Sequence, residues 1–177
     1  AERRGLPNIR SMVEAIPALI TEKSVKMFEK FGVFTKAELE SRVEILFEQY
    51  AQTINIEALA TLDIAKKQIV PAVMKYQKTL ADSVAVLKAT GMDTGVQESL
   101  LGEITENLKK LYTAIGILDS ETVKAQSIGE VNEQARFYHD VVFGCMNAVR
   151  EPADKLEMLV AKEDWPMPSY GDLIFEV

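Results

Sequence analysis

The sequence predicts an all-α protein: an antiparallel bundle of long, partly kinked helices, with short N-terminal helices and an extended C-terminal tail. Two observations carry this prediction. Long stretches of the 177 residues repeat apolar side chains in steps of three and four, the period of a helix that buries one face. Each of these stretches also opens with a residue pattern that caps helix N-termini. No strand pattern occurs before the last residues.

The first 34 residues predict short helices. Glycines and prolines interrupt this segment repeatedly, which prevents one long helix. Residues 11–16 and 21–31 have helical patterns between those breaks, and Thr21 is the expected N-cap of the second.

Three capping boxes open the long helices. In Thr35–Glu38, Thr94–Gln97 and Ser127–Glu130, a hydroxyl residue is followed three positions later by Glu or Gln. The hydroxyl accepts a hydrogen bond from a free backbone amide, and the longer side chain reaches back to the first residue. The predicted long helices span residues 36–90, 95–126 and 128–161.

Prolines and glycines mark the expected irregularities. Pro71 should kink the first long helix and Pro152 the last, because proline removes an amide and collides with the preceding turn. The β-branched stretch 53–56 leaves the continuity of the first helix open. Gly91 is the expected residue after its C-terminus.

Two apolar seams define the faces that pack together. Their steps alternate between three and four residues, as in helices that cross at a shallow angle. The phase jumps near Ser127, so we expect a turn there and antiparallel neighbours. The seams are Leu101, Ile104, Leu108, Leu111, Ile115, Leu118, Thr122 and Ala125, then Val131, Ala135, Tyr138, Val142, Cys145, Val149, Pro152, Leu156 and Leu159.

Composition narrows the classes of function. Apolar residues make up 47 % and charged residues 27 %, as in ordinary globular domains. The net charge of −7 argues against a nucleic-acid partner, which requires clustered Lys and Arg. No apolar run approaches the roughly 20 residues that cross a bilayer. The single cysteine, Cys145, excludes an internal disulfide, so we expect a cytoplasmic protein without a membrane partner.

The sequence contains no complete active site. His139 is the only histidine, and Cys145 lies six residues later, on a different helix face. One histidine cannot build a di-iron bundle site, and zinc lacks further ligands at suitable spacing. Neither a GxxxxGK[ST] loop nor a GxGxxG loop occurs. We therefore assign no catalytic, cofactor-binding or metal-binding residue.

Residues 53–72 are apolar on nearly every side, which predicts a helix buried on more than one face. One interpretation is a central bundle helix whose charges pair locally, Asp63 with Lys66 for example. The other is a surface that docks against another domain or subunit. Two prolines should keep residues 163–177 extended, with their aromatic side chains packed on a neighbour. The possible interface residues are Asn55, Glu57, Asp63, Lys66, Trp165 and Tyr170.

Four segments together resemble the C-terminal region of type III glutamine synthetases. They are residues 13–39, 53–72 (TINIEALATLDIAKKQIVPA), 153–157 (ADKLE) and 165–175 (WPMPSYGDLIF). The resemblance implies a ring-forming cytoplasmic enzyme that joins ammonia to glutamate with ATP and a divalent metal such as Mg²⁺. Its known metal and nucleotide motifs lie upstream of this region, so the chain alone is expected to be inactive.

On this interpretation, residues 1–34 join an upstream catalytic domain, 35–162 form the long-helix bundle and 163–177 form the tail. The expected partners are that catalytic domain and neighbouring subunits of the ring. Two alternatives remain open: a free-standing helical adaptor, or a regulatory bundle that binds a small effector. Met74, Tyr76, Tyr112, Tyr138 and Met146 are the candidates to line an effector pocket.

Overall fold

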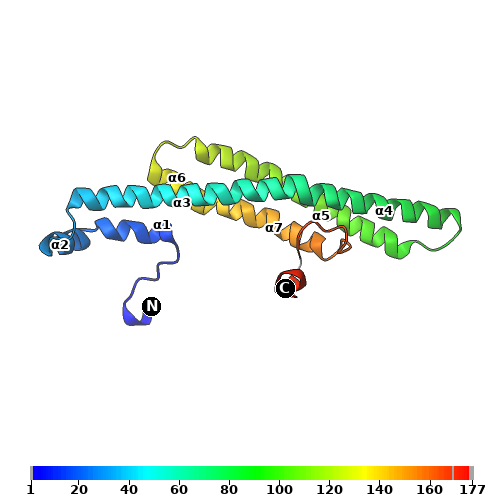
Figure 1. Ribbon diagram of the computed structural model, residues 1–177, viewed down its shortest axis with the longest axis horizontal. Coiled ribbons are helices and arrows are strands. Elements are labelled where there is room, and N and C mark those ends of the chain that lie inside the picture. The colour runs from blue at the N-terminus through cyan, green and yellow to red at the C-terminus, as the bar shows by residue number, and fades with distance from the viewer. Residues whose placement is uncertain (1, 169, 176–177) are drawn as a thin grey trace. The chain divides into compact units, whose positions relative to one another are not determined.

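The computed structural model describes residues 2–168 and 170–175, and every regular element among them is a helix (Figure 1). The expected all-α class is therefore confirmed. The chain divides into two compact units. The first unit contains residues 2–57 and 122–143, and the second contains residues 58–121 and 144–175 without residue 169.

Short helices open the first unit, as predicted. Ser11 caps one of them and Thr21 caps another, where the Thr21 hydroxyl accepts from the Ser24 amide at 3.4 Å. Val13 and Val25 turn their side chains into the core. These elements are η1 (Glu2–Arg4), α1 (Met12–Ala15), η2 (Ile16–Ile20) and α2 (Glu22–Lys30).

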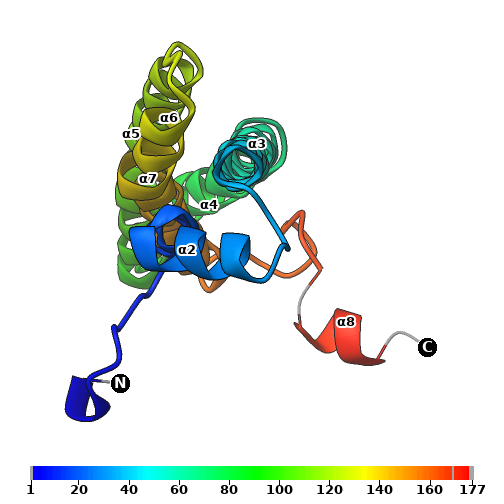
Figure 2. The ribbon, with the colours of Figure 1, turned by 90° about the vertical axis from the view of Figure 1, so that its left-hand side faces the viewer.

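Helix α3 (Lys36–Ile64) begins at the first predicted capping box. The Glu38 amide donates to the Thr35 hydroxyl at 3.3 Å, and the Thr35 amide donates to the Glu38 carboxylate at 2.7 Å. Helix α2 runs crosswise to α3, as the two views together show (Figure 2). Helix α3 is unbroken through the β-branched stretch 53–56, where the Thr53 hydroxyl donates to the Gln49 carbonyl at 2.9 Å.

The capping box at Thr35 predicts a pH dependence of stability. Hydrogen bonds from the Thr35 amide and hydroxyl hold the pKa of Glu38 below its ordinary value of 4.5. A lowered folded-state pKa stabilises the folded chain above the unfolded pKa, and this stabilisation is lost as pH falls through the folded value. We therefore expect Glu38→Gln to narrow the difference in urea midpoint between pH 6 and pH 3. Glu44→Gln on the same helix is the control, because it removes a carboxylate without a described hydrogen bond. The difference in urea midpoint between pH 6 and pH 3 should be larger in this control than in Glu38→Gln.

The third predicted capping box is wrong. Helix α6 (Val131–Phe137) begins later than expected, because the Glu130 carboxylate accepts from the amides of Asn132 and Glu133 at 3.1 and 2.6 Å. Ser127 instead donates its hydroxyl to the Lys124 carbonyl at 2.6 Å, within the last turn of α5. The predicted turn near Ser127 is confirmed. A π-helical turn, η4 (Tyr138–Val142), follows α6.

In the second unit, Pro71 lies in the first turn of α4 (Val70–Ala89), directly after a π-helical turn, η3 (Ala65–Ile69). The Val70 amide bonds to the Ala65 carbonyl, five residues back. A π-turn re-pairs backbone groups around a residue that lacks an amide. The irregularity expected at Pro71 therefore takes this form.

The end of α4 is closed as the sequence indicates. Gly91 has a φ of 74°, its amide bonds to the Lys88 carbonyl and the Met92 amide bonds to the Leu87 carbonyl, both at 3.1 Å. This left-handed position favours glycine and satisfies the free carbonyls of the last turn.

Helix α5 (Gly95–Gln126) then runs antiparallel to α4, and Figure 1 shows the turn that joins them. The contacts between residues 66–88 and 98–119 fall in reverse order along the chain, which is the signature of antiparallel neighbours. They are Lys88 to Glu98 at 2.5 Å, Gln77 to Thr105 at 2.7 Å and Lys66 to Asp119 at 2.7 Å.

The two predicted seams match the observed burial closely. Every seam residue is buried or half-buried, and Pro152 lies inside α7 (Phe143–Glu157), which continues beyond it. The fully buried side chains among them include Ile104, Leu111, Leu118, Tyr138, Val142 and Leu156.

The tail differs from the expected extended segment. Residues 165–168 are irregular, as their two prolines require, but Tyr170–Phe175 forms a short helix, α8. No proline follows Pro168, so the backbone amides of this segment are free to pair within a helix. An ion pair of 2.7 Å between Lys162 and Asp172 links the helix to the irregular segment before it.

Candidate interaction surface

Asn55 is half-buried and makes two hydrogen bonds to side chains far from it in the sequence. Its side-chain oxygen accepts from the Tyr138 hydroxyl at 3.0 Å and from the Gln126 amide at 2.9 Å. Tyr138 is only 2 % exposed, and burial raises the pKa of its hydroxyl, which therefore stays a neutral donor. These contacts explain why an amide occurs within an apolar stretch. The sequence seam located Tyr138, but it gave no signal for Gln126.

Glu57 lies on an exposed position of α3 in the first unit. Burial raises the pKa of Tyr50, and the carboxylates of Glu57 and Asp140 raise it further. The Tyr50 ring lies 6.4 Å from the ring of His139, centre to centre. Two half-buried rings and two exposed carboxylates therefore lie close together in this part of the first unit.

His139 and Cys145 are the two reactive side chains that the sequence analysis considered. The contacts described for His139 are the Tyr50 ring and the Asp140 carboxylate, which its Nδ1 meets at 2.6 Å. Burial, with the Glu121 carboxylate, raises the pKa of Cys145, which keeps the thiol protonated and weakly nucleophilic. Among the described residues, no three His, Cys, Asp or Glu side chains gather as a metal site would require.

The predicted pairing of Asp63 with Lys66 is wrong. Asp63 pairs with Lys67, one full helical turn away, whereas Lys66 reaches across to Asp119 on α5. Lys66 and Asp119 stand at a groove of about 430 Å³ between η3, α4 and α5. The other residues that line it are Val70, Tyr112, Ile115 and Gly116.

The all-round burial expected for residues 53–72 is also wrong for this chain. One stripe of the helix is buried, while Ile56 is 66 % and Leu59 46 % exposed. Ile56 and Leu59 therefore face solvent in this chain and are accessible to a partner outside it.

Three consecutive apolar side chains of the tail are exposed. Leu173, Ile174 and Phe175 of α8 are 67, 66 and 80 % exposed. Nearby in sequence, the indole nitrogen of Trp165 is buried and has no hydrogen-bond partner among the described residues. Asp164 beside it binds Lys75 at 2.7 Å, which fastens the irregular segment to α4. The side chain of Tyr170 lies outside the described residues.

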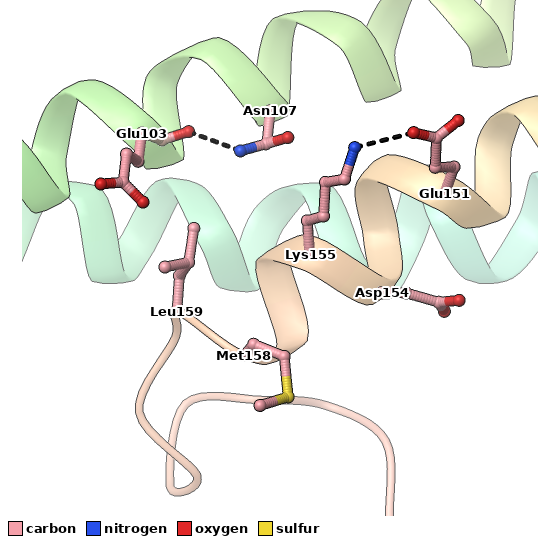
Figure 3. A pocket seen from close by; sticks show the side chains of 7 residues that line it. All are labelled: Glu103, Asn107, Glu151, Asp154, Lys155, Met158 and Leu159. Atoms are coloured by element: carbon pink, nitrogen blue, oxygen red, sulfur yellow. Dashed lines mark hydrogen bonds and ion pairs between the residues drawn. The ribbon is translucent and has the colours of Figure 1, made fainter.

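A further groove of about 460 Å³ lies between α5 and the end of α7 (Figure 3). Two of its polar side chains bind within their own helices: Lys155 binds Glu151 at 2.7 Å, and the Asn107 amide donates to the Glu103 backbone carbonyl at 2.9 Å. Met158 beside it is 85 % exposed. None of the five side chains considered for an effector pocket lines this groove; of them, only Tyr112 lines the groove at Lys66.

Comparison with known proteins decides the family. Residues 1–88 match the family model described as the glutamine synthetase C-terminal domain. The chain belongs to this family. It is 33 % identical over 181 residues to the type-3 glutamine synthetase of Dictyostelium discoideum, and the match covers 99 % of the chain. It is 30 % identical over 179 residues to a glutamine synthetase of Butyrivibrio fibrisolvens, which covers the whole chain.

The chain spans about a quarter of the length of those relatives, 25 and 26 % respectively. The resemblance to type III glutamine synthetases is thereby confirmed. In the described part of the chain, no helix is both long enough and apolar enough to cross a membrane.

Proposed function

We propose that this chain is a C-terminal helical accessory domain of a cytoplasmic glutamine synthetase, with a structural or subunit-interaction role. Its partners are an upstream catalytic domain and neighbouring subunits of a ring-shaped homo-oligomer. ATP-dependent ligation of ammonia to glutamate is the reaction of the parent enzyme. Family membership supports the assignment to such an enzyme.

One observation carries the interaction role: the exposed apolar side chains of α8. Leu173, Ile174 and Phe175 follow one another, so they cover more than one face of a six-residue helix. Burying an apolar side chain of this size contributes roughly 1.5–3 kcal/mol. The ion pair between Lys162 and Asp172 holds the helix to the irregular segment before it, which favours docking as one unit.

Magnesium in phosphate-transferring enzymes is held by one or two carboxylates together with substrate phosphates. Among the described residues, no three His, Cys, Asp or Glu side chains gather at one place. The lysines nearest the grooves are committed to carboxylates, Lys66 to Asp119 and Lys155 to Glu151. We therefore propose that the metal and nucleotide are bound outside this domain.

The test uses the full-length glutamine synthetase that carries this domain. We expect Phe175→Asp to shift the assembled enzyme toward smaller species in sedimentation velocity. Val96→Asp is the matched control, since it charges another exposed apolar side chain, 77 % exposed, away from α8. Unchanged assembly in the Phe175→Asp enzyme would contradict the role of α8. Glutamine formation by the purified 177-residue chain with ATP and Mg²⁺ would contradict the absence of an active site.

A further inference from the structure

A groove of about 410 Å³ in the first unit combines an apolar floor with an acidic rim. Val43 and Phe47 of α3 form the floor and are 6 and 3 % exposed. Pro17 and Ile20 of η2 form one wall. The volume falls in the range of roughly 300–1,000 Å³ that binding clefts occupy. The groove therefore has room for a few side chains of a partner.

The rim of the groove carries a negative charge without an ion-pair partner in the described part of the chain. Its charged residues are Glu40, Glu44, Glu130 and Arg136. Glu40 pairs with Lys36 at 3.4 Å, and the Glu130 carboxylate caps α6. The only cation of the rim, Arg136, donates to Asn132 at 2.9 Å, whereas Glu44 makes no hydrogen bond or ion pair among the described residues. A cationic, apolar segment would complement this lining.

The chain itself contains such a segment, residues 3–10. Arg3, Arg4 and Arg10 carry its charge, and the structure gives their side chains no ion pair among the described residues. Leu6 and Ile9 are 57 and 44 % exposed. Arg10 uses its backbone amide to bind Glu14 at 3.1 Å, which leaves its guanidinium available. The segment has the charge and the apolar side chains that the groove lacks.

The segment points away from the groove of its own copy. In both views, residues 2–10 extend from α1 on the side opposite α3 (Figures 1 and 2). We propose that the groove binds the basic segment 3–10 of a second copy of this chain. Arg10 meets Glu44, and Leu6 and Ile9 cover the floor formed by α3. This contact is separate from the docking of α8.

The test is sedimentation velocity of the 177-residue chain over a range of concentrations. We expect reversible self-association that weakens at high salt, because the contact includes exposed charges. Glu44→Arg and Arg10→Glu should each weaken it roughly tenfold, since each places like charges together. Both positions are exposed, and circular dichroism checks that both variants remain helical.

An equimolar mixture of the two variants gives the sharpest result. In a mixed pair, the arginine at position 44 of one variant meets the glutamate at position 10 of the other, so the charges attract again. The mixture should therefore associate more strongly than either variant alone. Phe175→Asp should leave this association unchanged, which separates it from the role of α8. A chain that stays monomeric at every concentration would overturn the proposal. So would single variants that associate like the unaltered chain, or a mixture without recovery.

Discussion

Replacing Leu118 with alanine is expected to lower the free energy of unfolding by about 2–5 kcal/mol. Leu118 of α5 is fully buried in the core of the second unit. The substitution removes apolar contacts and leaves a cavity, since the surrounding helices relax only in part. Chemical denaturation followed by circular dichroism measures the effect.

The neighbouring residue provides the control for this change. Ile117 is 51 % exposed on the same helix, so Ile117→Ala should cost far less. Both substitutions introduce alanine into α5, which keeps helix propensity favourable in each case. Similar losses at the two positions would contradict the burial that distinguishes them.

Replacing Asn55 with leucine should cost about 1–3 kcal/mol. The substitution keeps the size of the side chain but leaves the Tyr138 hydroxyl without its acceptor in a buried position. The Gln126 amide loses its partner as well. Thermal and denaturant unfolding of the single variant give the magnitude.

A double-mutant cycle isolates the cause. Asn55→Leu leaves the Tyr138 hydroxyl without an acceptor, and Tyr138→Phe removes that hydroxyl. The double variant should therefore be more stable than the sum of the two single losses predicts. Gln126→Ala tests the second contact in the same way. Strictly additive losses would show that Asn55 and Tyr138 do not depend on one another.

Local patterns predicted most of the fold because helix formation depends on spacing and caps. The seam from Leu101 to Ala125 matched burial on α5, since a period of 3.6 places those side chains on one face. Thr35 and Gly91 marked helix ends because free amides and carbonyls there require specific residues. The start of α6 differs from the prediction because the Glu130 carboxylate caps the amides of Asn132 and Glu133, while the Ser127 hydroxyl bonds to the Lys124 carbonyl.

The candidate surface was less predictable because it depends on contacts between distant residues. Spacing alone could not show that Lys66 reaches Asp119, 53 residues away, instead of Asp63. Exposure of Ile56 and Leu59 likewise follows from what the rest of the chain leaves uncovered. The groove at Glu44 combines η2, α3 and α6, which no single sequence window contains.

The order of the two units along the chain has a consequence for folding kinetics. The contact between Asn55 and Gln126 closes a separation of 71 residues, and the chain between them contributes its residues 58–121 to the second unit. The α4–α5 hairpin within that stretch relies on contacts of short sequence separation, which form quickly. Once the hairpin has formed, the effective loop between residues 57 and 122 is much shorter. Closing this loop then costs less conformational entropy than closing it in the unfolded chain. We therefore expect the hairpin to form before the hydrogen bonds of Asn55 do.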